Sequence, residues 1–101
     1  MHIITRLLLI ALLSSPAWGT PRLQDKIGQL IIVGFQGTSI QSPSVQMLQS
    51  QIQAKKIGGG IFYGHNIISK PQTQQLIKAL QKSALHHPLF IAVDQEGGQV
   101  Q

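Results

Sequence analysis

Residues 88–100 read PLFIAVDQEGGQV, and the interpretation of the whole chain starts from them. Leu89 to Val93 form an unbroken apolar run, which is typical of a strand that is buried on both faces. The run ends abruptly at Asp94, and Glu96 and two glycines follow. In parallel α/β folds, the loops at the carboxyl ends of the strands hold the ligands. Asp94 therefore stands where we expect a side chain that contacts a substrate.

Two earlier apolar runs predict two more strands, at residues 30–35 and 58–63. Apolar residues at helical spacing predict three helices, over residues 21–29, from 43 to near 56, and from 70 to the turn at 86–88. Lys55 and Lys56 are expected in the last turn of the second helix, where they suit the negative end of the helix dipole.

This alternation of strands and helices predicts right-handed βαβ units and a parallel sheet, and therefore an α/β fold. We expect the strand that ends at Val93 to occupy a central position, flanked by the two earlier strands. The pattern leaves two architectures open, a doubly wound sheet and a barrel.

The composition argues against several classes of protein. The net charge is +5, but Lys55 and Lys56 are the only adjacent basic pair, whereas a nucleic-acid interface needs a basic stripe with interleaved aromatic residues. The sequence has no cysteine, which excludes disulfides and thiolate metal sites. No spacing of His, Asp and Glu fits a metal site, and residues 58–60 precede a strand, where a phosphate-binding loop is not expected. We expect no nucleic acid, no metal and no cofactor.

Residues 1–19 have the layout of a secretory signal peptide. An apolar core at residues 7–13 follows a single arginine, and Ala17 and Gly19 supply small residues at the −3 and −1 positions of a cleavage site. The core is too short to span a bilayer comfortably, so we expect no stable membrane span after cleavage. The protein is expected to be exported, either periplasmic or secreted. An uncleaved membrane anchor is the alternative.

Asp94 and Glu96 lie two positions apart, so on an extended backbone both side chains point to the same side. Glycosidases use paired carboxylates, about 5 Å apart when they retain configuration and wider when they invert. From the residues alone, these two acids are a candidate pair. The alternative is that Asp94 caps a turn and that Glu96 is a surface charge.

Three motifs in this order resemble glycoside hydrolase family 3, and in particular its β-N-acetylhexosaminidase branch. Ile91–Gly98 resembles the family signature, residues 26–35 resemble its opening segment, and residues 58–62 with the Asn66-Ile67 pair resemble its second strand and loop. The resemblance implies an N-terminal (β/α)8 TIM barrel, of which residues 20–101 would be the first three parallel strands with their helices. A complete barrel needs roughly 250 residues, so we expect a truncated, incomplete barrel domain.

The resemblance also implies roles for the acidic residues. The family's aspartate at the position of Asp94 hydrogen-bonds hydroxyls of the sugar in the −1 subsite, and the nucleophile is a different aspartate on a later strand. We therefore expect Asp94 to bind substrate and Glu96 to hold the loop, and no residue of this sequence is assigned to catalysis. Gln99 departs from the family, which usually has an arginine there and with it a forked, charged donor.

The proton donor of the N-acetylglucosaminidase branch is a histidine–aspartate dyad on a later loop, so no histidine of this sequence matches it. His86 and His87 are expected in a solvated turn on the face opposite the site. His65 follows the second strand at the sugar-facing end, where a pocket-lining role and a solvated one are both open.

The resemblance implies a retaining glycosidase that releases β-linked N-acetylhexosamine from cell-wall or chitin-type glycans by double displacement. The chain by itself is expected to be inactive, because the nucleophile and the acid/base are missing. Two alternatives from other classes are a truncated, non-catalytic remnant that self-associates through unpaired strand edges, and a small sugar-binding module.

Overall fold

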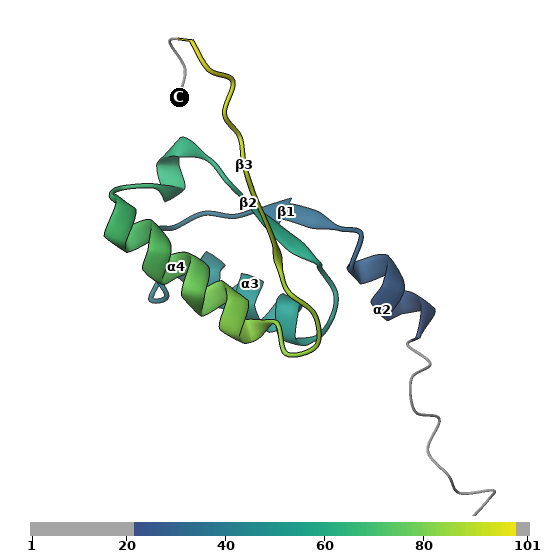
Figure 1. The fold of residues 1–101 in the computed structure, drawn as a ribbon. Coiled ribbons are helices and arrows are strands. Elements are labelled where there is room, and N and C mark those ends of the chain that lie inside the picture. The colour runs from purple at the N-terminus through teal and green to yellow at the C-terminus, as the bar shows by residue number, and fades with distance from the viewer. Residues whose placement is uncertain (1–21, 99–101) are drawn as a thin grey trace, which may run out of the picture.

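A computed structural model describes residues 22–98, and the expected leader at residues 1–19 lies outside this range, as does Gln99. Within these residues, three strands and three helices alternate along the chain, with a short 3₁₀ turn after the second strand. Figure 1 shows their arrangement. The elements are α2 (Leu23–Gly28), β1 (Ile32–Gly34), α3 (Pro43–Gln53), β2 (Gly59–Phe62), η1 (Gly64–Asn66), α4 (Lys70–Ser83) and β3 (Phe90–Val93). The α/β class and the number of strands agree with the sequence prediction. No helix within residues 22–98 is long and apolar enough to cross a membrane.

The three strands form one parallel sheet in the order β1-β2-β3. The prediction that β3 would be central is wrong, because β2 occupies the centre and β3 lies at an edge. Each βαβ crossover moves the chain one strand further in the same direction, so the spatial order follows the sequence order. In a doubly wound sheet the order reverses at a switch point, whereas in a barrel consecutive strands are neighbours.

Helices α3 and α4 cover one face of this sheet and form the core with it. Phe35 and Phe62 lie at the centre of the core, edge to face, with their ring centroids 5.1 Å apart. The other buried apolar residues come from both helices and from the residues that lead into β2 and β3: Val45, Leu48, Ile52, Ile57, Leu76, Leu80 and Leu89.

The second face of the sheet is uncovered within the described residues, and we call it the open face. Alternation along the strands places on it Ile32, Gly34, Gly59, Ile61, Tyr63, Phe90, Ala92 and Asp94. Phe90 is 65% exposed and Ile32 is 48% exposed there. The prediction that residues 89–93 are buried on both faces is therefore wrong, because within residues 22–98 helices pack against one face only.

Helix α3 ends at Gln53, one turn earlier than predicted, so Lys55 and Lys56 lie beyond its last turn. Lys55 has a φ of 61°, in the left-handed region. The amide of Lys56 donates to the carbonyl of Gln51 over 3.0 Å, and the amide of Lys55 donates to the carbonyl of Ile52 over 3.0 Å. This pattern is a Schellman cap that stops the helix, here with lysine at a position where glycine is commoner.

The glycine run at residues 58–60 meets close backbone approaches at two of its positions, since a Cβ on Gly59 would lie 2.8 Å from the carbonyl oxygen of Phe90. A Cβ atom on Gly58 would lie 2.6 Å from the carbonyl carbon of Gln29, whereas a Cβ on Gly60 would have ordinary contacts of 3.9 Å with Leu48 and 4.0 Å with Phe35. We expect Gly58→Ala to lower the free energy of unfolding by about 2–3 kcal/mol and Gly60→Ala by less than about 1 kcal/mol. Urea unfolding of the two variants measures the difference, and equal effects would contradict this account.

Candidate site at the carboxyl edge of the sheet

The loops that leave β1, β2 and β3 meet at one edge of the sheet, and Asp94 lies in the last of them. Its amide donates to the carbonyl oxygen of Phe62 over 2.9 Å, which extends the pairing of β2 with β3 by one step. Asp94 is exposed, and strand alternation places it on the open face beside Tyr63. Glu96 is also exposed, two residues further on.

The carboxylates available for chemistry are few. The sequence has three acidic residues, Asp25, Asp94 and Glu96. Asp25 belongs to α2, before β1, and accepts hydrogen bonds of 3.3 Å from two nitrogens of the Arg22 guanidinium, which lower the pKa of Asp25. Since it lies near Lys55 and His87, at the amino-terminal ends of the strands, it is remote from the loop of Asp94. Only Asp94 and Glu96 stand at the carboxyl edge.

Asn66 ties the exit of β1 to the exit of β2. Its side chain is fully buried, and its Nδ2 donates to the carbonyl oxygens of Phe35 over 3.1 Å and of Gly37 over 2.9 Å. Its Oδ1 accepts from the amide of Tyr63 over 2.9 Å. These three bonds fix the loop at residues 35–37 against the turn η1, so that the rim of the site has one shape.

Gln72 anchors the same rim from the first turn of α4. Its Nε2 donates to the carbonyl oxygens of Thr38 over 2.7 Å and of Asn66 over 2.9 Å. Its Oε1 accepts from the amides of Ile68 and Ser69, and the hydroxyl of Ser69 accepts in return from the amide of Gln72. The reciprocal pair is a capping box, and the S-x-x-Q spacing at residues 69–72 was a readable signal for it that sequence analysis did not use.

The three histidines within residues 22–98 lie at opposite ends of the sheet, as predicted. His65 is in η1 at the carboxyl edge, with its Nε2 3.1 Å from the carbonyl oxygen of Phe35. Its ring stacks on Tyr63, with centroids 5.8 Å apart and 11° between the ring planes.

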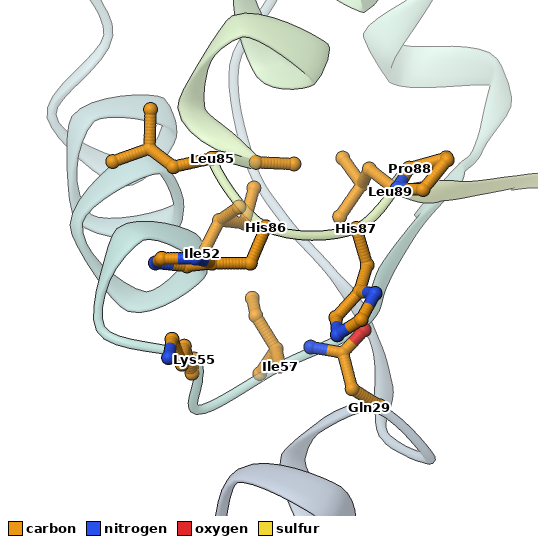
Figure 2. A pocket seen from close by; sticks show the side chains of 11 residues that line it. Gln29, Ile52, Lys55, Ile57, Leu85, His86, His87, Pro88 and Leu89 are labelled. Atoms are coloured by element: carbon orange, nitrogen blue, oxygen red, sulfur yellow. The ribbon is translucent and has the colours of Figure 1, made fainter. Parts of the chain in front are cut away.

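His86 and His87 lie in the turn before β3, at the amino-terminal end of the strands. Figure 2 shows them beside a small pocket with Gln29, Lys55 and Ile57. The pocket has a volume of about 10 Å³ and so can hold a single water molecule. A sugar does not fit in this pocket.

Among residues 22–98, no three side chains of His, Cys, Asp or Glu come together in a way that could hold a metal ion. The chemical groups at the carboxyl edge are thus carboxylates, a phenol, an imidazole and amides, which bind ligands by hydrogen bonding and ring contact.

Successive parallel strands, helices on one face and a carboxylate at the carboxyl edge define an α/β protein, a class in which ligands bind in the loops after the strands. The particular group follows from comparison with known proteins. The chain belongs to glycosyl hydrolase family 3, since the model of that family's N-terminal domain matches residues 22–101. The resemblance stated from the sequence motifs is confirmed.

Curated relatives carry one name. A "Beta-hexosaminidase" of Xylella fastidiosa is 35% identical over 72 residues, which is 71% of this chain and 20% of that protein. The "Beta-hexosaminidase" of Photobacterium profundum is 48% identical over 50 residues, which is 50% of this chain and 15% of that protein. The chain therefore spans about a fifth of the length of the first of these relatives.

Two solved structures share the fold. One, of a fungal multi-domain GH3 β-N-acetylglucosaminidase with a GCN5-related glucosamine N-acetyltransferase region, is 38% identical with a TM-score of 0.69 and covers 79% of this chain and 10% of that chain. The other, a glycoside hydrolase family 3 β-N-acetylglucosaminidase from Paenibacillus sp. str. FPU-7, is 31% identical with a TM-score of 0.63 and covers 78% of this chain and 15% of that chain.

Proposed function

We propose that this chain supplies the first three strands of a TIM barrel in a retaining glycoside hydrolase that removes β-linked N-acetylhexosamine from cell-wall or chitin-type glycans. Residues 20–101 belong to that barrel domain, and Asp94 is the carboxylate that binds the substrate. Export through a leader at residues 1–19 is part of the same proposal. The shared name of the curated relatives supports the choice of sugar.

The open face supports the barrel. Its residues fall into rows across the three strands, with Ile32, Gly59 and Phe90 in register in the first row and Gly34, Ile61 and Ala92 in the second. The interior of a (β/α)8 barrel is filled by such layers of side chains, which face away from the helices. The open face is apolar and exposed to solvent within residues 22–98, and it would be buried once further strands close the barrel.

The proposed function depends on the position of Asp94. It follows the last residue of β3, on the open face and at the carboxyl edge, which in a barrel is the mouth that holds the ligand. A carboxylate there accepts hydrogen bonds from sugar hydroxyls with the extra strength of a charged acceptor. The chain has three carboxylates and Asp25 is remote, so a catalytic pair from this chain would have to be Asp94 with Glu96.

The function is tested in a chimera that carries residues 22–101 of this chain in place of the matching segment of the Paenibacillus β-N-acetylglucosaminidase. We expect the chimera to hydrolyse a chromogenic N-acetyl-β-glucosaminide, and the unchanged relative serves as the control. A folded chimera without turnover would contradict the proposal.

The 101-residue chain by itself is expected to give no turnover of the same substrate. Double displacement needs a nucleophile and a proton donor at the anomeric carbon, and we assign neither role to Asp94 or Glu96. A chromogenic assay with an enzyme-free blank measures this. Turnover by the wild-type chain that disappears in Asp94→Ala would contradict this expectation.

A non-catalytic association module is the second candidate function, and the exposed apolar residues of the open face favour it. Phe90 on this face is 65% exposed, and Met47 on the outer side of α3 is 63% exposed. We expect the chain alone to self-associate, and Phe90→Lys to shift it toward monomer while the matched control Met47→Lys does not, because a charge on the open face opposes its burial. Analytical ultracentrifugation reports the distribution. A monodisperse, cooperatively melting wild-type monomer would contradict this.

A further inference from the structure

We propose that Tyr63 is a specificity-determining residue of the sugar site, a ring on which the apolar face of the pyranose packs while Asp94 holds its hydroxyls. This inference rests on the proposed function and adds a second contact residue to it. Tyr63 was predicted only as the end of a strand, and no role was assigned to it.

The backbone puts the Tyr63 ring over the sheet at the mouth of the site. Tyr63 follows β2 and lies on the open face, where its Cε2 atom would be 2.9 Å from a Cβ on Gly34. The missing side chain of Gly34 is therefore what gives the ring its place. A larger residue at position 34 would push the ring away from the sheet.

The ring is held in orientation by its neighbours and remains accessible. The amide of Tyr63 is fixed by Asn66, and the ring stacks on His65 at 11° between planes. Tyr63 is nevertheless 36% exposed. An oriented, accessible aromatic side chain that carries a hydroxyl is suited to contact a ligand that has both apolar and polar surface.

Tyr63 and Asp94 are neighbours across the sheet. Phe62 pairs with Val93 in the parallel register, so the next step brings Tyr63 opposite Asp94 on the same face. Binding sites commonly combine aromatic walls with a few polar groups that fix orientation. A pyranose has that dual character, since its axial C–H groups form an apolar face and its hydroxyls project at the edge.

The test uses the whole chain in the Phe90→Lys background, which limits association through the open face, and methyl N-acetyl-β-glucosaminide, with acetamide as the control ligand. Tyr63 is the sole tyrosine of the sequence, so its ring protons are unique NMR signals. We expect saturable binding in the tens-of-millimolar range, upfield ring-current shifts of the sugar C–H protons, and cross-relaxation between these protons and the Tyr63 ring. Tyr63→Phe should keep the affinity within about twofold, and Tyr63→Leu should weaken it about fivefold or more and remove the upfield shifts.

The outcomes separate this inference from the proposed function. Sugar binding that is lost in Asp94→Asn but unchanged in Tyr63→Leu would overturn the role of Tyr63 and leave the function standing. Absence of saturable binding, or binding without contact to the ring, would also overturn it. The contact between the sugar protons and the Tyr63 ring is measured without any change at position 63. The test therefore holds even if Tyr63→Leu does not fold. Failure of the function itself is seen independently, as a folded chimera without turnover.

Discussion

Asp94→Ala in the chimera is expected to lower kcat/KM for a chromogenic N-acetyl-β-glucosaminide by about 100- to 1,000-fold. Hydrogen bonds to a charged group contribute about 1.5–3 kcal/mol each, and a carboxylate at the mouth of the barrel can accept two from vicinal hydroxyls. Losing both at the lower end of this range, about 3–4 kcal/mol, corresponds to this fall in kcat/KM, since about 1.4 kcal/mol is a factor of ten. Steady-state kinetics measure it.

Glu96→Ala is the matched control, because Glu96 is a second exposed carboxylate in the same loop. We expect it to stay within about threefold of the chimera, as surface substitutions commonly do. The kcat/KM of Asp94→Asn should lie between those of Asp94→Ala and Glu96→Ala, since an amide keeps an acceptor oxygen but loses the charge. If Asp94→Ala and Glu96→Ala have equal small effects, Asp94 is not the residue that binds the sugar.

Replacing Asn66 is expected to have the largest effect on stability. Its buried side chain donates to two carbonyl oxygens and accepts from one amide, so Asn66→Ala should lower the free energy of unfolding by about 2–4 kcal/mol. Asn66→Asp should cost more at pH 7, because a carboxylate oxygen would then face the carbonyl oxygens of Phe35 and Gly37. Urea unfolding of both variants, in the Phe90→Lys background that limits association, measures the difference.

The Asn66→Asp variant has a distinctive pH dependence. Burial and the facing carbonyl oxygens disfavour its charged form, so the pKa of the introduced carboxyl is raised in the folded state. The folded state then binds more protons than the unfolded state, and the variant gains stability as the pH falls toward its unfolded pKa near 4. The difference in the free energy of unfolding between Asn66→Asp and Asn66→Ala should become smaller from pH 7 to pH 5. A gap that is constant or widens would show that this side chain does not face the two carbonyls.

The elements were predictable from sequence, but their environment was not. Helical spacing in α3 and α4 and the apolar runs of β2 and β3 gave the strand count and the parallel α/β class, which are properties of local pattern. Tertiary packing decides that β3 lies at the edge of the sheet and that the side chain of Phe90 is exposed to solvent. An apolar run in the sequence does not say which elements pack together. The length of α3 was overestimated because the stop at Lys55 uses a left-handed conformation, which glycine usually signals.

The candidate site was predictable in part. The run ending at residue 94 placed Asp94 at the carboxyl edge, where it lies, whereas its sugar-binding role stays a prediction. The bonds from Asn66 and Gln72 to the loop at residues 35–38 were missed because they join residues 29 to 34 positions apart, which no local motif reveals. The stack of Tyr63 on His65 was missed for a related reason, since it depends on the turn η1 and on the space left by Gly34.

The most direct test of the central claim is a crystal structure of the chimera with N-acetylglucosamine bound. We expect β3 of this chain to pair with the next strand of the barrel and the Asp94 carboxylate to lie about 2.5–3.0 Å from hydroxyl oxygens of the sugar, as in ordinary O–H···O hydrogen bonds. A sugar bound in an intact barrel but away from Asp94, or an Asp94 side chain turned out of the barrel, would contradict the account.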